Sequence, residues 1–129
     1  MTGGEVRGTA ELRRRAAPLL LWFAVLGGAV AWSAHLLVGW GLEEIACSPV
    51  SAGPEVLGVS LTVWIGALTV VLGAVTVAAG LLAWRFWRLE GAGRAGFMAR
   101  FGLAANALFL LMIVYGGLSL LLLRPCTRT

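Results

Sequence analysis

The sequence contains no lysine and no aspartate, only one histidine and two cysteines, and only 12% of its 129 residues are charged. Soluble domains carry about twice that charged fraction. No acidic residue lies inside the long apolar runs, which weighs against a proton-coupled exporter or carrier, because such a protein needs an ionisable relay within the membrane. The chain also lacks a phosphate-binding loop, a catalytic triad and a soluble region that could hold a substrate. We therefore expect a protein that is not an enzyme.

What the chain does contain is three long apolar runs, which predict three membrane-spanning helices over residues 18–40, 56–83 and 101–123. Each run is long enough to cross about 30 Å of hydrocarbon at 1.5 Å per residue. A spanning segment must be helical, because lipid cannot satisfy free backbone groups. The expected fold is an all-α, integral membrane three-helix bundle over residues 18–129, preceded by a basic N-terminal segment over residues 1–17.

The positions of the arginines predict the orientation of this bundle. Only Arg124 and Arg128 follow the third run, whereas the other eight lie before the first run or around the connection between the second and third: Arg7, Arg13, Arg14, Arg15, Arg85, Arg88, Arg94 and Arg100. By the positive-inside rule, the N-terminus is cytoplasmic, and the C-terminus and the loop 41–55 lie outside. We expect a multi-pass protein of the bacterial inner membrane that contacts lipid, and no nucleic-acid partner.

A secretory signal peptide is the competing interpretation of the N-terminus. The basic start, the apolar stretch and the sequence Ala29-Val30-Ala31 resemble such a signal and its cleavage site. However, the apolar run continues to Trp40, which suits a full membrane span better than the short core of a signal peptide. Residues after the arginines do not fit a twin-arginine export signal either.

Small residues recur along one face of the second apolar run. They are spaced by three or four positions, which places them together on a helix: Gly58, Thr62, Gly66, Thr69, Gly73, Thr76 and Gly80. Helices associate in lipid through small residues that allow close approach. The second span is therefore expected to be the central helix, against which the other two pack.

Few strongly polar residues lie within the expected spans, and such residues suggest a function by default. Counting residues from the outer boundary places His35, Thr62 and Tyr115 at comparable depths, so a hydrogen bond from His35 to Thr62 or Tyr115 is the leading interpretation. A contact of His35 with a partner subunit or its cofactor stays open. Haem or metal ligation by this chain alone is disfavoured, because there is no second histidine. Asn106 is expected to form an interhelical hydrogen bond.

Both cysteines follow spans that exit on the outer side. Cys47 comes shortly after the first span and Cys126 directly after the third, on the face where disulfides form and persist. A Cys47–Cys126 disulfide would close a loop of about 80 residues and contribute on the order of 4 kcal/mol. The alternative is copper binding by both thiolates, which requires them to be reduced.

Two glutamates, Glu43 and Glu44, lie near the outer end of the first span. Negative charge there opposes the helix dipole. We expect two solvated carboxylates, with an acidic contact for a basic partner as the alternative.

Two segments, "LWFAVLGGAVAWSAHLLVGWGLEEIAC" and "RFGLAANALFLLMIVYGGLSLLLLRPC", carry a resemblance to a known family. Their points of similarity are Trp32, His35 and Leu36, the spacing from the glutamate pair to Cys47, and the closing Pro125–Cys126. The arrangement resembles small three-helix bacterial membrane proteins, an uncharacterised family whose genes accompany those for haem-copper cytochrome c oxidases. This resemblance implies a respiratory context.

The leading functional hypothesis is a non-catalytic subunit or assembly factor of a respiratory haem-copper oxidase. Such a protein would have no cofactor of its own, and any haem or copper would be held by other integral membrane subunits. It would dock through a face of the first or third span. The alternatives are a copper-handling protein that uses Cys47 and Cys126, and a small homo-oligomeric pore or carrier packed through the second span.

Overall fold

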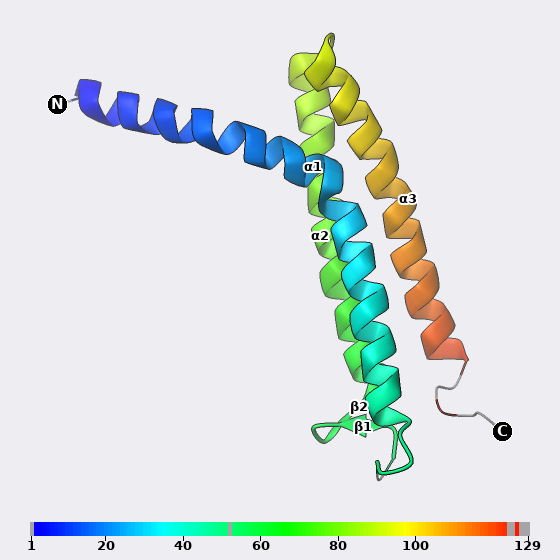
Figure 1. Cartoon of the computed structure of the whole chain (residues 1–129). Coiled ribbons are helices and arrows are strands. Elements are labelled where there is room, and N and C mark those ends of the chain that lie inside the picture. Colours follow the sequence, from blue (N-terminus) through cyan, green and yellow to red (C-terminus); the bar gives the residue numbers. More distant parts are fainter. Residues whose placement is uncertain (1, 52, 124–125, 127–129) are drawn as a thin grey trace.

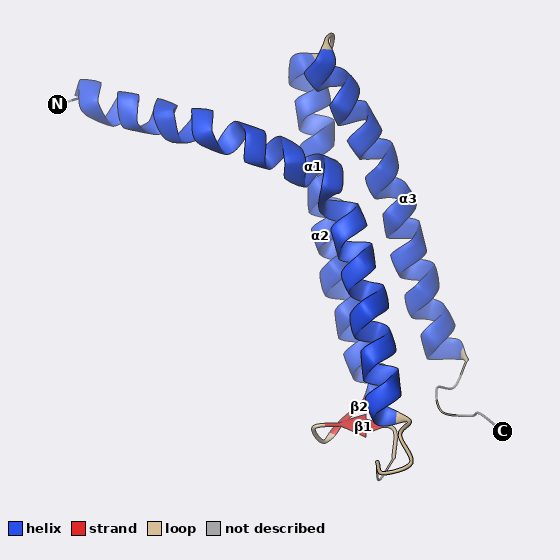
Figure 2. Ribbon diagram, in the orientation of Figure 1, coloured by secondary structure: helices blue, strands red, loops and turns tan. Residues whose placement is uncertain are grey.

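The computed structural model describes residues 2–51, 53–123 and 126, and its helices form a three-helix bundle (Figures 1 and 2). The elements in chain order are α1 (Thr2–Ala46), β1 (Glu55–Val56), β2 (Val59–Ser60), α2 (Leu61–Glu90) and α3 (Arg94–Leu122). Each helix contacts the other two. Three segments are long and apolar enough to cross a membrane, namely Ala17–Ala46, Leu61–Glu90 and Arg94–Leu122. The prediction of a helical fold with three helices long and apolar enough to span a membrane is confirmed.

Helix α1 is longer than the others and contains both the polar N-terminal segment and the first apolar segment. Its N-terminal part projects sideways from the bundle, and the helix bends before it runs along α2 and α3 (Figure 1). Pro18 lies inside the helix at the start of the apolar segment. Proline removes one backbone hydrogen bond and its ring crowds the preceding turn, which is the usual cause of such a bend.

The expected start of the second span at residue 56 is wrong. Residues 55–60 form a two-stranded antiparallel hairpin in which Glu55 pairs with Ser60 and Val56 with Val59. Both residues of its turn have positive φ, 55° at Leu57 and 75° at Gly58, as a two-residue turn of this hand requires. Helix α2 begins only at Leu61, where the Ser60 side chain accepts a hydrogen bond from the Val63 N–H.

The helices also continue further at their other ends than the apolar runs predict. Helix α1 reaches Ala46, α2 reaches Glu90 and α3 begins at Arg94. These extensions contain arginine, tryptophan and glutamate, whose polar groups suit the membrane interface while the backbone remains helical. The helices therefore extend beyond the apolar runs into residues that suit the membrane interface.

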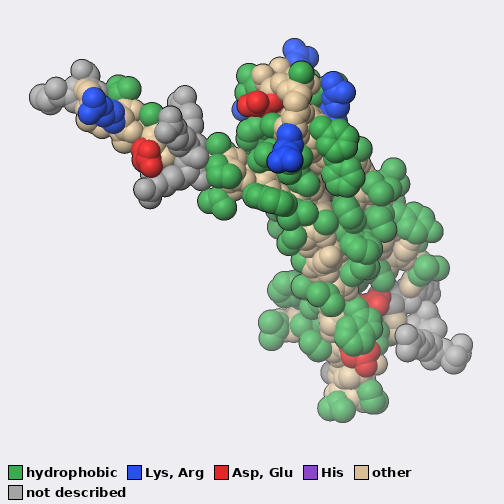
Figure 3. All heavy atoms as spheres, turned by 45° about the horizontal axis from the view of Figure 1, so that its top comes forward, with side chains coloured by type: hydrophobic (Ala, Val, Ile, Leu, Met, Phe, Trp, Pro, Cys, Tyr) green, Lys and Arg blue, Asp and Glu red, His purple; other side chains and the backbone are tan. Residues whose placement is uncertain are grey.

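The connection between α2 and α3 is three residues long and forces the two helices to run antiparallel. Gly91 and Gly93 both have positive φ, 48° and 100°, which glycine adopts without steric cost. The connection lies at the end of the bundle from which the N-terminal part of α1 leaves, and the hairpin lies at the opposite end (Figure 1). Figure 3 shows basic side chains gathered around the first of these ends.

The contacts between the helices are made mainly by small side chains. Six of the nine buried hydrophobic residues in the described part of the chain are alanines, namely Ala24, Ala31, Ala46, Ala79, Ala83 and Ala99. Most large apolar side chains point outward. This is the arrangement expected in lipid, where close backbone approach favours association and outward leucine and valine are well solvated.

Candidate functional site

The most elaborate polar contact within the bundle is centred on Asn106 of α3. Its side-chain Nδ2 donates to the carbonyl oxygen of Ala24, at 2.6 Å, and its Oδ1 accepts from the backbone N–H of Gly28, at 2.8 Å. In a regular helix, the N–H of residue 28 would bond to the carbonyl of residue 24. The Asn106 amide therefore engages both members of one backbone pair of α1. This is the interhelical role expected for Asn106, here directed at the backbone.

Glycines on both helices make this contact sterically accessible. A Cβ on Gly102 would lie 2.9 Å from the Ala24 carbonyl oxygen, and a Cβ on Gly28 would collide with the Asn106 side chain. On the other side of α1, a Cβ on Gly27 would lie 2.7 Å from Cβ of Ala79 in α2. The three helices thus approach one another closely at this level, and no larger residue fits at these glycines without a shift.

A second polar contact joins His35 of α1 to Thr69 of α2. His35 is buried, with 3% of its surface exposed, and its Nε2 lies 3.0 Å from the Thr69 hydroxyl oxygen. That hydroxyl donates its single proton to the Ile65 carbonyl oxygen, at 2.8 Å. When the hydroxyl donates to Ile65, it accepts from the histidine, an arrangement that uses the Nε2–H tautomer of His35.

The two partners predicted for His35 are wrong. Thr62 lies two helical turns from Thr69 on the same face of α2 and is exposed, and Tyr115 is 72% exposed on α3. The error has a physical cause. Helix α1 ends six residues later than expected, and α2 begins five residues later. His35 therefore lies deeper in the bundle, beside Thr69 in the row of small residues on α2. Glycine packs against it there, with Gly116 alongside the imidazole.

Only part of the stripe of small residues on α2 packs against the other helices. Gly73 and Thr76 are buried, and Thr69 and Gly80 are half-buried against α1 and α3. Gly66 has nothing within 4 Å of the position of a Cβ, Thr62 is exposed, and Gly58 lies in the hairpin turn. The stripe is therefore a packing surface only from Thr69 onward. Facing it on α3, a Cβ on Gly117 would lie 2.5 Å from the Thr69 hydroxyl oxygen.

The two cysteines form a disulfide, as the sequence predicts. Cys47 and Cys126 are bonded, with their Cα atoms 5.2 Å apart and a separation of 79 in the sequence. The bond ties the end of α1 to the segment after α3, and both sulfur atoms that copper binding would require are occupied in it. No group of three or more histidine, cysteine or acidic side chains that could hold a metal ion occurs in residues 2–51, 53–123 and 126.

The two glutamates beside this bond lie where the last turn of α1 meets the loop. Glu43 is half-buried and Glu44 is exposed. The backbone carbonyl of Glu43 accepts a hydrogen bond from the Cys47 N–H, at 2.8 Å. The carboxylate of Glu44 is thus accessible from outside the bundle.

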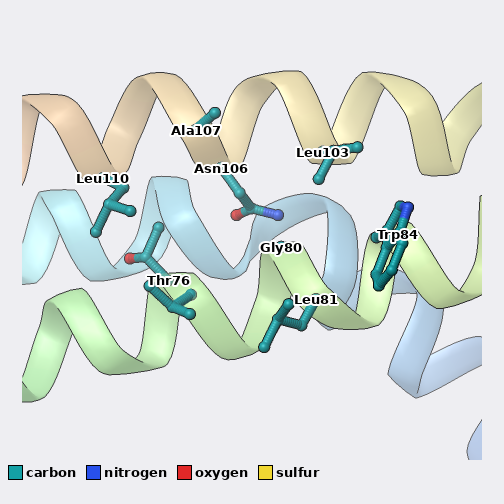
Figure 4. A pocket seen from close by; sticks show the side chains of 9 residues that line it. Thr76, Gly80, Leu81, Trp84, Leu103, Asn106, Ala107 and Leu110 are labelled. Carbon is teal, nitrogen blue, oxygen red and sulfur yellow. The ribbon is translucent and has the colours of Figure 1, made fainter.

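The structure also reveals a feature that the sequence reasoning missed, an apolar groove of about 310 Å³ between α2 and α3. Figure 4 shows it from close by, with Thr76 toward one end, Trp84 at the other and α1 behind. At the Trp84 end, Arg88 lies over the Trp84 ring and Arg100 over the Trp87 ring, each 5.5 Å from the ring centroid. The spacing of four between Trp84 and Arg88 could have indicated the first pair, but the second joins two helices.

Comparison of the chain with protein-family models, with curated proteins and with solved structures finds no match. The contacts described above are therefore the basis of the proposals that follow.

Proposed function

We propose that the protein is a small non-catalytic membrane subunit or assembly factor that docks onto a larger complex through its outward-facing helix surface. A respiratory haem-copper oxidase is the partner that the resemblance favours, with haem or copper held by the partner subunits. The observation that carries the proposal is that the interior polar side chains are already used within the bundle. Asn106, His35 and Thr76 all bond to α1 or α2.

Because the interior polar groups already have hydrogen-bond partners, we infer that the outward-facing surface of the bundle carries the function. A transport path or a catalytic site needs polar groups that can change partners, whereas each of these side chains has a fixed partner in the described structure. The buried side-chain nitrogen and oxygen atoms of the described residues all have hydrogen-bond partners. The outward faces, in contrast, carry large side chains at high exposure on every helix.

Tyr115 on α3 supports docking through the third span. Its side chain is 72% exposed, and it lies seven residues, about 10 Å, before the end of α3. A hydroxyl at that depth gains from a hydrogen-bonding partner, because lipid chains offer none. A polar group of a neighbouring subunit would supply it.

We infer that the arginine-bearing end faces the cytoplasm of a bacterial cell. The N-terminal part of α1 and the α2–α3 connection lie at this end (Figure 1), and the positive-inside rule assigns arginine-rich ends to the cytoplasm. The disulfide at the opposite end is then on the oxidising side. Reporter fusions test the orientation: a reporter active only in the cytoplasm should work after Ala92 and fail after Thr129, and the reverse pattern would contradict it.

Purification of the tagged chain from its native membrane in mild detergent tests the proposed function. We expect haem-copper oxidase subunits to co-purify, identified by mass spectrometry, together with haem bands in the reduced-minus-oxidised spectrum. A colourless preparation without these subunits would contradict the respiratory proposal. Selective ion or solute flux through liposomes that contain only this chain would contradict a purely structural role.

Matched tryptophan substitutions identify the docking face. Leu37 on α1, Val70 on α2 and Leu111 on α3 are 71%, 71% and 68% exposed, so each tolerates a larger side chain in lipid. We expect Leu37→Trp or Leu111→Trp to abolish co-purification and Val70→Trp to preserve it. Tyr115→Phe should weaken co-purification if the hydroxyl has the proposed role. Loss with Val70→Trp alone would contradict docking through the first or third span.

A further inference from the structure

We propose that the groove between α2 and α3 binds one anionic phospholipid, with an acyl chain in the groove and the phosphate between Arg88 and Arg100. This site is separate from the proposed docking role and does not depend on the identity of any protein partner. The inference combines three observations: the shape of the groove, its apolar lining, and two guanidinium groups at one of its ends.

The groove has the form and chemistry of an acyl-chain site. Its volume is about 310 Å³, and it opens to the outside of the bundle. Gly80 leaves space in its wall, and Leu81, Leu103 and Leu110 supply apolar surface. From Thr76 to Trp84 it follows α2 for about 12 Å at 1.5 Å per residue, which is most of one leaflet of a hydrocarbon core about 30 Å thick.

Its polar lining residues are not free to bind a polar ligand. The Thr76 hydroxyl donates to the Leu72 carbonyl oxygen, at 2.9 Å, and both ends of the Asn106 amide contact α1. What the groove offers to an occupant is therefore aliphatic and aromatic surface. A hydrocarbon chain fits that surface, and the membrane supplies it at high concentration.

Two arginines lie beyond the Trp84 end of the groove, one on each of the two helices that form it. Arg88 lies one turn beyond Trp84 on α2, and Arg100 lies about one turn before Leu103 on α3. Each guanidinium lies over a tryptophan ring, which holds it near the rim of the bundle. A guanidinium held over an aromatic ring still has N–H groups in its own plane for bidentate contact with a phosphate.

The local charge selects for an anionic headgroup. Arg85, Arg88, Arg94 and Arg100 are all exposed in this region, against one carboxylate, Glu90. Figure 3 shows the basic side chains around this end of the bundle above the apolar surface. A zwitterionic headgroup adds its own positive charge to this region, whereas phosphatidylglycerol brings a net negative charge.

Native mass spectrometry of the full-length chain in detergent provides the test. The chain is mixed with phosphatidylglycerol or with phosphatidylcholine of identical acyl chains, and bound lipid is counted. We expect one tightly retained phosphatidylglycerol, weaker retention of phosphatidylcholine, and no displacement by inorganic phosphate. Arg88→Gln and Arg100→Gln should each lower phosphatidylglycerol retention about fivefold. Arg7→Gln removes the same charge from the projecting part of α1 and should leave retention unchanged.

The acyl-chain part of the site is tested separately. Ala107 lines the groove on α3, whereas Ala104 is exposed on the same helix and does not line it. Ala107→Phe should lower retention of both lipids, and Ala104→Phe should not. An unchanged circular dichroism spectrum and an intact disulfide confirm that each variant is folded.

Several results would overturn the proposal. Equal retention of the two lipids, or an Arg7→Gln loss as large as that of Arg88→Gln, would exclude selection of the headgroup by the flanking arginines. Equal behaviour of Ala107→Phe and Ala104→Phe would exclude the groove. Displacement of the lipid by inorganic phosphate would show a phosphate site that does not need the acyl chain.

Discussion

The side-chain amide of Asn106 on α3 donates a hydrogen bond to the backbone carbonyl oxygen of Ala24 on α1, with 2.6 Å between the two atoms. Its oxygen meets the N–H one turn further along the same helix, at Gly28. A side chain thus recognises the backbone of a neighbouring helix inside the apolar region. Such a contact fixes the register of α3 against α1, because a shift of either helix by one residue removes both bonds.

Replacement of Asn106 should destabilise the bundle only moderately. Asn106→Ala removes two interhelical hydrogen bonds, but the Gly28 N–H and the Ala24 carbonyl remain within a continuous helix in which they can bond to each other. We expect a loss of about 1–2 kcal/mol in the free energy of unfolding. Asn106→Asp should cost more, because an ionised carboxylate is expensive in the membrane. Denaturation in mixed micelles measures both, and wild-type stability of Asn106→Ala would contradict an energetic role for the contact.

The glycines should divide into those that need to be glycine and those that do not. At Gly102 a Cβ would lie 2.9 Å from a backbone oxygen, and at Gly66 it would meet nothing within 4 Å. Gly102→Ala should therefore cost roughly 1–3 kcal/mol, because backbone must shift. Gly66→Ala makes the same change in α2 and should alter stability by less than about 0.5 kcal/mol. Equal effects in the same denaturation assay would show that close approach at Gly102 is not limiting.

The contact between His35 and Thr69 should appear as a coupling energy. In a double-mutant cycle with His35→Ala and Thr69→Val, the non-additive part of the stability change isolates the pair. We expect a coupling of about 0.6–1.7 kcal/mol, as for other hydrogen bonds between membrane helices. Tyr115 serves as the control, since its side chain is 72% exposed and the hydrogen bond of His35 goes to Thr69. A coupling of His35 to Tyr115→Phe, but not to Thr69→Val, would favour the partner predicted from the sequence.

The disulfide should be present in cells and should contribute to stability. Cys47→Ser, Cys126→Ser and the double variant all remove the same bond, so we expect equal losses of about 4 kcal/mol. Alkylation of intact cells without a reductant should leave both cysteines unmodified. Modification of both thiols under these conditions would contradict the disulfide and would revive the copper-binding hypothesis.

Much of this architecture could be predicted from composition and spacing. The three apolar runs predict three helices, because backbone N–H and C=O groups in lipid must hydrogen-bond to one another. The structure contains these three helices. Two cysteines that each follow a span leaving the membrane on the same side predict a disulfide, and the structure contains the Cys47–Cys126 bond. Asn106, a lone amide within an apolar run, predicts an interhelical hydrogen bond. In each case the physical constraint acts on one segment or one side chain.

The sequence by itself thus determined the number of spans, the clustering of arginines at one end and the pairing of the two cysteines. Only the tertiary structure decided the depth and partner of each polar group. The partner of His35 depends on where α1 ends and α2 begins, and a two-residue turn at Leu57 and Gly58 moved that start by five positions. The groove and its flanking arginines depend on the rotation of α3 against α2. Both are properties of packing between helices, where a shift of one turn changes every contact and leaves the apolar pattern of each helix unchanged.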